Sequence, residues 1–483
     1  MLEILSHSSH FLPFLPPKRR REIRKTQLSF FDFSPHFQIS LSIEADFRKY
    51  LLSLMCKRSK ESDMDNLMRK LPIGIQTFED IRRKNYLYVD KTALVWRMAN
   101  LGKPYFLSRP RRFGKSLLLS TFESYFLGKK ELFEGLAIEQ METEWTEHPV
   151  LHLDLNAEKY DKPEKLNDIL SNHLTQWELQ YGKGLDEKTP SARFGGVIRR
   201  ACEQTGHQVV VLVDEYDKPL LQAITNLELL EEYRQSLKAF YGVLKSTDRY
   251  LRFVFLTGVT KFSQVSVFSD LNQLNDISLD YSYATLCGIT REELIATFKP
   301  EIETFGRKNH QSPEEVVTAM ERNYDGYHFH PDGDGVFNPF SVLNAFSKLE
   351  LGNYWFQTGT PTFLIELLQK SDYDLRTLLN GIEAPVSSFA EYRVDANNPI
   401  PLIYQSGYLT IKDYDREFQN YLLAFPNDEV RYGFINFLVP FYTPMKNNDQ
   451  GFYIGKFVQD LRTGDYDSFL TRLEAFFLSL IHI

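Results

Sequence analysis

Residues 104–120, PYFLSRPRRFGKSLLLS, carry the strongest local signal in the chain. The apolar residues at 105–107 predict a short buried strand, and the apolar spacing that begins at Ser116 predicts a helix. A strand, a loop that ends in Gly-Lys-Ser and a helix form the usual context of a phosphate-binding loop. Loop amides and the positive helix end would face the anion, and Gly114 would let the backbone approach it closely.

The predicted loop departs from the pattern G-x-x-x-x-G-K-[ST] at its first position, where this chain has Arg109. Lys115 would reach the β- and γ-phosphates of a nucleotide, and the Ser116 hydroxyl would hold Mg²⁺. The other candidate nucleotide-contacting residues of the loop are Arg111, Arg112, Phe113 and Gly114. The alternative interpretation is a basic turn that ends at a helix N-terminus.

A second segment, QVVVLVDEYDK at 208–218, ends an apolar run in two carboxylates. The run at 209–213 is typical of a strand that is buried on both faces of a parallel sheet. Ligands bind at the carboxyl ends of such strands. Asp214 would therefore hold Mg²⁺ and Glu215 would polarise an attacking water. The alternative is a strand end with two solvated acids.

Two further strands are predicted at 150–155, VLHLDL, and at 251–257, LRFVFLT, and helical patterns such as 231–245 lie between the strands. This alternation predicts an α/β fold, a parallel P-loop NTPase sheet flanked by helices, followed by a mostly helical region. Thr257 ends the last strand, where a hydroxyl could sense the γ-phosphate or simply begin a loop. Because an extra strand unit separates the phosphate loop from Asp214, the pattern fits the additional-strand branch of P-loop ATPases.

Composition narrows the function classes. The 483 residues are 43% hydrophobic and 25% charged, and the net charge is 56 − 64 = −8. These values are ordinary for a globular protein and argue against a globally basic nucleic-acid binder. Three well-separated cysteines suit neither a disulfide framework nor a zinc site, so we expect a reducing, cytoplasmic compartment. No apolar run reaches the ~18 residues of a membrane span, so no membrane partner is expected.

The order of these patterns suggests five regions. A helix–hairpin–helix pattern near 395–440 is compatible with a winged helix, and its acidic residues favour a structural or lid role over DNA reading. The apolar pattern at the end suggests that a further domain begins there and is truncated. The expected regions are a disordered or spurious leader at 1–63, a P-loop domain at 64–290, a helical lid or linker at 291–395, a winged-helix-like module at 396–465 and the start of that further domain at 466–483.

Several phrases of the sequence resemble the AAA-ATPase-like family of bacterial and archaeal proteins, over roughly residues 68–475. They are LPIGIQTFEDIRRKNYLYVDKT (71–92), FLSRPRRFGKSLL (106–118), VVLVDEYDKPL (210–220), FVFLTGVTKFS (253–263), LCGIT (286–290), YDGYHF (324–329) and GYLTIKDYD (407–415). Arg109 in place of the first loop glycine is similar to the family's own pattern. The resemblance implies Gly114, Lys115 and Ser116 as the phosphate loop, with Asp214 and Glu215 as the metal and water residues.

The resemblance also bears on partners. Members of the family commonly carry a PD-(D/E)XK nuclease-like domain after the ATPase part, and no acid-x-Lys arrangement of that kind occurs near the end of this chain. We therefore expect that domain to be missing, and any nucleic-acid partner would act through it.

The sequence thus predicts a Mg²⁺-dependent ATP-binding ATPase, a nucleotide-driven switch or motor that could form a homo-oligomer. Arg252, Arg291 or a neighbouring subunit could supply an arginine finger. One alternative is a nucleotide-gated interaction module with little hydrolysis. The other is the ATPase half of a nucleic-acid-processing, nuclease-linked protein.

Overall fold

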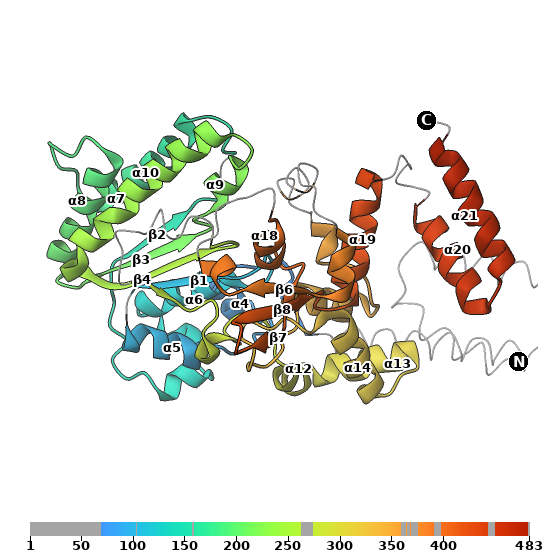
Figure 1. Cartoon of the computed structure of the whole chain (residues 1–483). Helices are drawn as coiled ribbons and strands as arrows, with labels where there is room; N and C mark the ends of the chain where they lie inside the picture. Colours follow the sequence, from blue (N-terminus) through green and yellow to red (C-terminus); the bar gives the residue numbers. More distant parts are fainter. Residues whose placement is uncertain are drawn as a thin grey trace, which may run out of the picture. The chain divides into compact units, whose positions relative to one another are not determined.

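The computed structural model describes residues 69–481 apart from 103, 157–158, 262–273, 359–363, 365–367, 369–374, 391–397 and 443–449. The leader predicted at 1–63 lies outside the described residues. The described part contains a parallel sheet with helices on both faces, a group of four helices, a small antiparallel sheet and a C-terminal helical pair (Figure 1).

The large sheet has five parallel strands in the order β2-β3-β4-β1-β5. The run at 209–213 is fully buried as predicted, because helices cover both faces of the sheet. Strand β4 pairs with β1 on one side and β3 on the other, so the α/β fold with an added strand is confirmed. The strands are β1 Tyr105–Ser108, β2 Val150–Asp154, β3 Val209–Asp214, β4 Leu251–Gly258 and β5 Asn275–Asp276.

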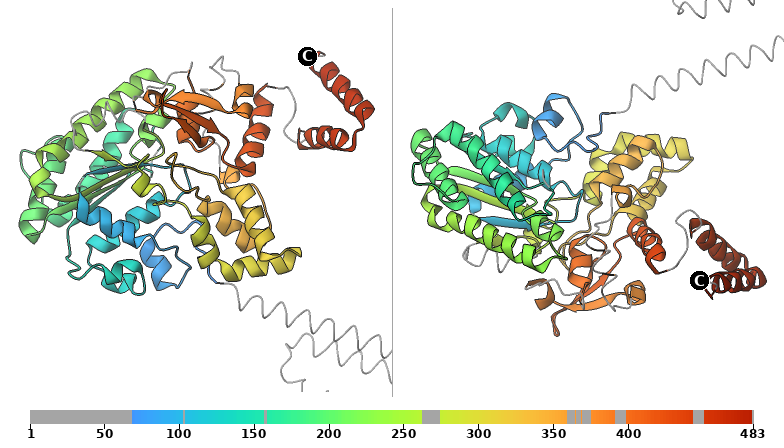
Figure 2. Two further views of the ribbon diagram at one scale, coloured as in Figure 1. Left: turned by 60° about the horizontal axis from the view of Figure 1, so that its bottom comes forward. Right: turned by 90° about the horizontal axis from the view of Figure 1, so that it is seen from above.

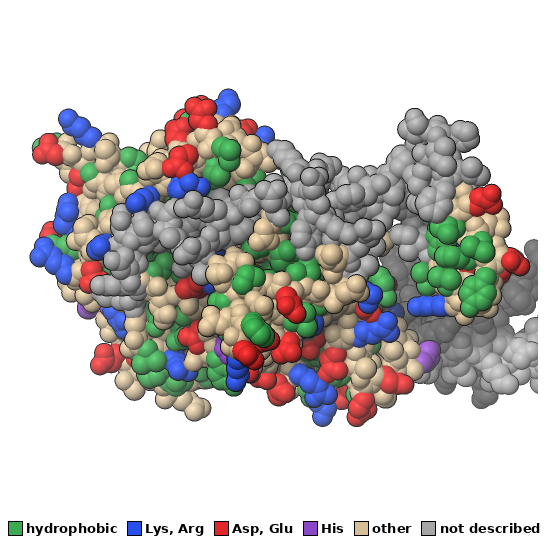
Figure 3. All heavy atoms as spheres, viewed as in Figure 1, with side chains coloured by type: hydrophobic (Ala, Val, Ile, Leu, Met, Phe, Trp, Pro, Cys, Tyr) green, Lys and Arg blue, Asp and Glu red, His purple; other side chains and the backbone are tan. Residues whose placement is uncertain are grey.

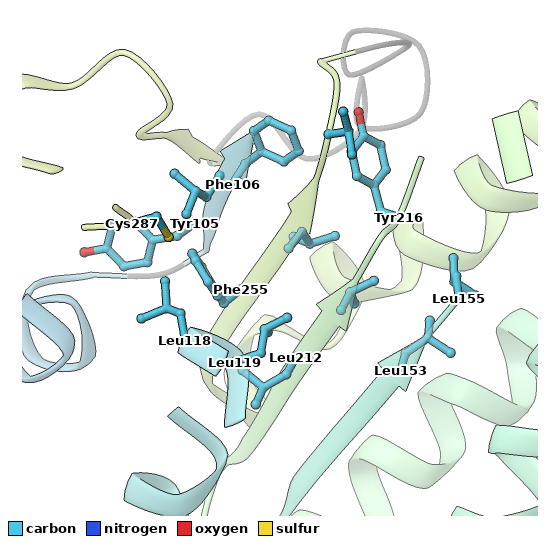
Figure 4. Packing of buried hydrophobic residues seen from close by; sticks show 14 of the residues in the cluster. Tyr105, Phe106, Leu118, Leu119, Leu153, Leu155, Leu212, Tyr216, Phe255 and Cys287 are labelled. Carbon is cyan, nitrogen blue, oxygen red and sulfur yellow. The ribbon is translucent and has the colours of Figure 1, made fainter. Parts of the chain in front are cut away.

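Helices cover both faces of this sheet (Figures 1 and 2). One face packs against α4 Phe78–Arg83, α5 Thr92–Leu101 and α6 Lys115–Phe126, and the other against α7 Glu164–Tyr181, α8 Pro190–Thr205 and α10 Leu227–Ser246. Short helix α9, Lys218–Gln222, follows β3. Figure 4 shows Leu118 and Leu119 of α6 beside Leu212 and Phe255 of the sheet. Burial of these side chains fixes the helix that begins at the phosphate loop.

Four helices form a second apolar core with Leu87 and Val89 from the segment before α5. Two of them begin with a capping box, Thr290 with Glu293 and Ser312 with Glu315, which explains where these helices start. The helices are α12 Arg291–Thr297, α13 Lys299–Asn309, α14 Pro313–Tyr324 and α15 Pro339–Lys348.

The small sheet is antiparallel, in the order β6-β8-β7. The hairpin of the helix–hairpin–helix pattern is present as β7 and β8, which pair from Thr410 opposite Ala424 to Asp415 opposite Asn420. Strand β6 lies within the 291–395 segment, which was expected to be a helical lid or linker, and its four residues pair with β8. The elements are β6 Ile382–Pro385, α17 Ser387–Ala390, α18 Ile400–Gln405, β7 Thr410–Asp415, β8 Asn420–Ala424 and α19 Asp428–Tyr442.

The last two helices are α20 Gln450–Thr463 and α21 Tyr466–Ile481. They pack on each other through Phe457 and Phe469, whose ring centroids are 5.5 Å apart. Arg472 forms an ion pair with Asp460 at 2.6 Å. None of the helices in the described part of the chain combines the length and the apolar character that a membrane span requires.

Candidate active site

Three predicted site residues meet at the carboxyl edge of the large sheet. The Ser116 hydroxyl at the start of α6 donates a hydrogen bond to Asp214 Oδ2 at 2.5 Å. The Thr257 hydroxyl at the end of β4 donates to Asp214 Oδ1 at 2.7 Å. Because β4 lies between β1 and β3, this hydroxyl is placed next to the carboxylate at the end of β3. Both oxygens of Asp214 are therefore oriented by hydroxyl groups from separate elements.

The phosphate loop brings Lys115 to the same edge. Its ammonium group is buried and donates to the carbonyls of Arg109 at 3.0 Å and Pro110 at 3.2 Å. Gly114 has φ +92° and Arg112 has φ +66°, so the loop takes the left-handed conformation at these two positions. A side chain at Gly114 would be strained by this conformation, although no other atom lies within 4 Å of the Cβ position. Lys115 holds the loop closed around its own side chain.

Glu215 follows Asp214 directly and is partly buried. Burial raises the pKa of its carboxyl group above the ordinary value, while the charge of Lys115 lowers it. The residue has φ +50°, a left-handed conformation that is uncommon for a residue with a side chain. Backbone strain of this kind tends to persist where the surrounding structure holds a functional group in place.

Arg109 points away from the predicted phosphate position. Its guanidinium group is 1% exposed and donates to the carbonyls of Ser108, Ser278 and Tyr283 at 2.9, 2.7 and 3.1 Å. It also lies 3.9 Å from the centre of the Phe329 ring, and burial lowers its pKa to about 10. The left-handed positions of the loop are elsewhere, so position 109 tolerates a side chain.

Phe113 also turns into the core. Its ring packs edge-on against Tyr327 at 4.7 Å and Phe329 at 5.6 Å, in the YDGYHF segment. Its side chain is 1% exposed, so only its backbone can contribute to a phosphate site. The side chains of Arg111 and Arg112, by contrast, are exposed. The loop thus exposes the side chains of Arg111 and Arg112 and buries that of Phe113.

The C-terminal region holds the outer part of the loop. Trp355 Nε1 donates to the carbonyl of Arg111 at 3.0 Å. A Cβ built on Gly407 would lie 2.6 Å from Pro110, so the GYLTIKDYD segment packs directly against the loop. Arg112 lies 5.1 Å from the centre of the Phe340 ring at the start of α15. Sequence reasoning missed these contacts, because the only signal was an aromatic cluster without a recognisable motif.

Asp217 is a second carboxylate near this edge of the sheet, and the sequence analysis did not single it out. It is 1% exposed and accepts hydrogen bonds from Thr260 N and Oγ1, each at 2.7 Å, and from Val259 N at 3.1 Å. Burial raises the pKa of this carboxyl group. Asp217 therefore fixes the backbone that follows β4, whereas Asp214 faces Ser116.

An apolar pocket of about 100 Å³ opens beside Gly114 and Leu117. It combines the segment before α5, the LCGIT segment and α15, which come from distant parts of the sequence. Lys91 lines it and binds both oxygens of Glu293 at 2.6 and 2.7 Å. Its other lining residues include Leu87, Tyr88, Val89, Leu286, Cys287, Ile289, Pro339 and Leu343.

Neither candidate arginine finger lies in the site. Arg252 is the second residue of β4, at the opposite end from Thr257, and donates to the carbonyl of Ala99. Arg291 begins α12 and pairs with Glu321 at 2.6 Å. Any finger from these two residues would require them to leave these partners.

Comparisons with known proteins show the family of the chain. The family model described as Predicted AAA-ATPase matches residues 72–268. An uncharacterized protein in the vnfD 5′ region of Azotobacter chroococcum mcd 1 is 38% identical over 418 residues, 86% of this chain and 78% of the relative. Among solved structures, the Aeropyrum pernix ORC2 protein (ADPNP-ADP complexes) covers 72% of this chain and 94% of its own at 12% identity, but a TM-score of 0.26 is too low to carry an argument. The family model, together with a relative that is 38% identical along most of both chains, shows that this chain belongs to the predicted AAA-ATPase family.

Proposed function

We propose that this protein is a Mg²⁺-dependent ATPase whose nucleotide state is sensed by its C-terminal region. The observation that supports this most strongly is the chain of hydrogen bonds from Ser116 to Asp214 to Thr257, at 2.5 and 2.7 Å. It links the start of the phosphate-loop helix to the ends of β3 and β4. A basic turn or a solvated strand end would have no need for this arrangement.

The oxygen atoms of Ser116 and Asp214 suit a hard divalent cation, because Mg²⁺ binds one or two protein oxygens together with substrate phosphates. Mg²⁺ bound there would neutralise charge on the β- and γ-phosphates. The Thr257 hydroxyl keeps the Asp214 carboxylate in one orientation. Lys115 would exchange its loop carbonyls for phosphate oxygens, so nucleotide binding would open the bonds that now close the loop.

Glu215 would take the proton of the attacking water. Partial burial raises its pKa, which favours a general base working near neutral pH. Arg111 and Arg112 are exposed next to Gly114, where their charges would attract phosphates. The nearby apolar pocket would take the nucleobase, since its lining is mostly aliphatic and aromatic.

The contacts of the loop also favour a switch. Trp355 and Gly407 touch the loop from outside the large sheet, so a change of the loop on hydrolysis would reach the small antiparallel sheet. The same site could therefore also serve the second candidate function, that of a nucleotide-gated interaction module. In the winged-helix-like module α18 is buried, so we propose a structural role for it rather than DNA reading. Figure 3 shows acidic and basic side chains interspersed among the described residues of the face in view, which argues the same way.

The test is ATP binding and steady-state hydrolysis by the full chain with and without Mg²⁺. Lys115→Ala should abolish binding, whereas Lys130→Ala, at an exposed lysine, should not. Glu215→Gln should bind ATP but lose turnover, and Glu203→Gln is its exposed control. Binding without turnover in the wild type would favour the gated module. A folded protein that binds no ATP would refute the assignment.

The remaining expectations extend this proposal. We place the protein in the cytoplasm, acting as a homo-oligomer whose neighbouring subunit supplies the arginine that Arg252 and Arg291 do not. Sedimentation with and without ATP tests the oligomer. Stimulation of hydrolysis by DNA or RNA would support a link to nucleic-acid processing, and unchanged turnover would count against it.

A further inference from the structure

A small cavity lies behind the phosphate loop, on the side away from the predicted nucleotide. Its volume is about 20 Å³, which is room for one water-sized particle. Three segments line it: the phosphate loop at 108–110, the end of the YDGYHF segment at 327–329, and residues 404–410, which include the start of GYLTIKDYD. The nucleotide site does not use this cavity.

Three hydrogen-bond donors that line the cavity lack partners among the described residues. They are Nε of Arg109, the hydroxyl of Tyr327 and Nε2 of Gln405, and all three side chains are at least 95% buried. The orientation of the Gln405 amide is fixed, because its Oε1 accepts from Lys261 N at 3.0 Å. A buried donor without an acceptor is costly, so three beside one cavity indicate a shared ligand.

Several acceptors around the cavity already take part in hydrogen bonds within the protein. The carbonyls of Ser108 and Ser278 accept from Arg109, and the Thr410 hydroxyl accepts from His328 N at 2.7 Å. A water needs acceptors for its own hydrogens as well as donors. Arg109 Nε and Gln405 Nε2 can only donate, and the Tyr327 hydroxyl can donate as well, so a single anion could accept from all three.

The charge balance points the same way. Lys261 lines the cavity and is neutralised by Asp276 at 2.8 Å. Arg109 makes no ion pair among the described residues: its guanidinium group donates to three carbonyls and faces the Phe329 ring, and Asp276, whose charge acts on it, already pairs with Lys261. An isolated buried cation is unfavourable unless a counter-charge lies close to it. One negative charge in the cavity would supply it.

We propose that this cavity binds one small monovalent anion, chloride under cellular conditions. The anion accepts from Arg109, Tyr327 and Gln405 and so ties the root of the phosphate loop to the YDGYHF segment and to α18. Its binding stabilises the folded protein and does not depend on the proposed ATPase function.

The test is thermal unfolding of the full chain in chloride, bromide and gluconate at one ionic strength. The midpoint should rise with halide and level off, by about 2 °C or more over gluconate. Tyr327→Phe keeps the ring against Phe113 but removes one donor, so it should lose most of this response. Tyr354→Phe, which removes a hydroxyl bonded to the Glu350 carbonyl in the second apolar core, should keep it.

Two further measurements keep the proposal falsifiable. Gln405→Glu places a carboxylate in the cavity and should make the midpoint independent of halide. A crystal grown in bromide should show one anomalous peak within hydrogen-bond distance of Arg109 Nε. Equal halide responses in wild type, Tyr327→Phe and Gln405→Glu, or no bromide at this position, would overturn the proposal and leave a water-filled cavity.

Discussion

The contact between Trp355 and the phosphate loop gives a direct test of the coupling between the loop and the C-terminal region. Trp355→Phe removes the hydrogen bond from Nε1 to the Arg111 carbonyl but keeps an aromatic ring beside Tyr408, whose centroid is 5.2 Å away. A neutral hydrogen bond contributes about 1 kcal/mol. If the bond holds the loop in its binding-competent form, its loss should weaken ATP binding by about fivefold.

The assay is a fluorescence titration with a labelled ATP analogue, together with urea unfolding of each variant. Trp177→Phe is the matched control: the same change in α7, where Trp177 packs against Phe194. The control should lose some stability but keep its ATP affinity. Equal affinities for Trp355→Phe and wild type, or the same loss in Trp177→Phe, would refute the claim that this bond positions the loop.

Three carboxylates give further predictions, two for stability and one for hydrolysis. Burial raises the pKa of Glu429 to about 7 from 4.5, so its stabilising effect is complete below about pH 4.5 and is lost as the pH rises through 7. The free energy of unfolding, measured in urea, should fall by about 3 kcal/mol more over this range in wild type than in Glu429→Gln; parallel curves would contradict this. Asp217→Asn should destabilise the protein by about 3 kcal/mol, because the amide faces N–H donors from Thr260 and Val259. Asp214→Asn should abolish hydrolysis with a smaller loss of stability than Asp217→Asn. If Asp217→Asn instead abolishes hydrolysis and Asp214→Asn causes the larger loss of stability, the roles assigned to the two carboxylates are exchanged.

The sequence predicted the sheet well because its signals are local. Continuous apolar runs at 209–213 and 253–256 can only be buried between two layers of helices, and each is followed by a polar residue at the carboxyl edge of the sheet. The hydrogen bonds of Asp214 to Ser116 and Thr257 follow once the strand order is known. That order depends on crossovers, which periodicity does not encode.

The direction of the loop side chains could not be predicted from the sequence. Phe113 was a candidate nucleotide contact and Arg109 stands in place of a loop glycine, yet both side chains are buried. Their partners Ser278, Tyr283 and Phe329 lie more than 160 residues further along the chain. Only tertiary contacts decide whether an arginine at the first position of the loop faces solvent or is buried, as Arg109 is.

The contacts of these buried side chains make the loop less free to move than a glycine-rich loop. A flexible loop closes on phosphates by changing its own backbone, at little cost to the rest of the protein. Here Arg109 is bonded to the loop at 278–283, and Trp355 holds the carbonyl of Arg111. When Lys115 leaves the carbonyls of Arg109 and Pro110 for a nucleotide, the loop can adjust only if these partners move as well. Nucleotide binding is therefore expected to change the conformation of the C-terminal region, and a switch requires such a coupling.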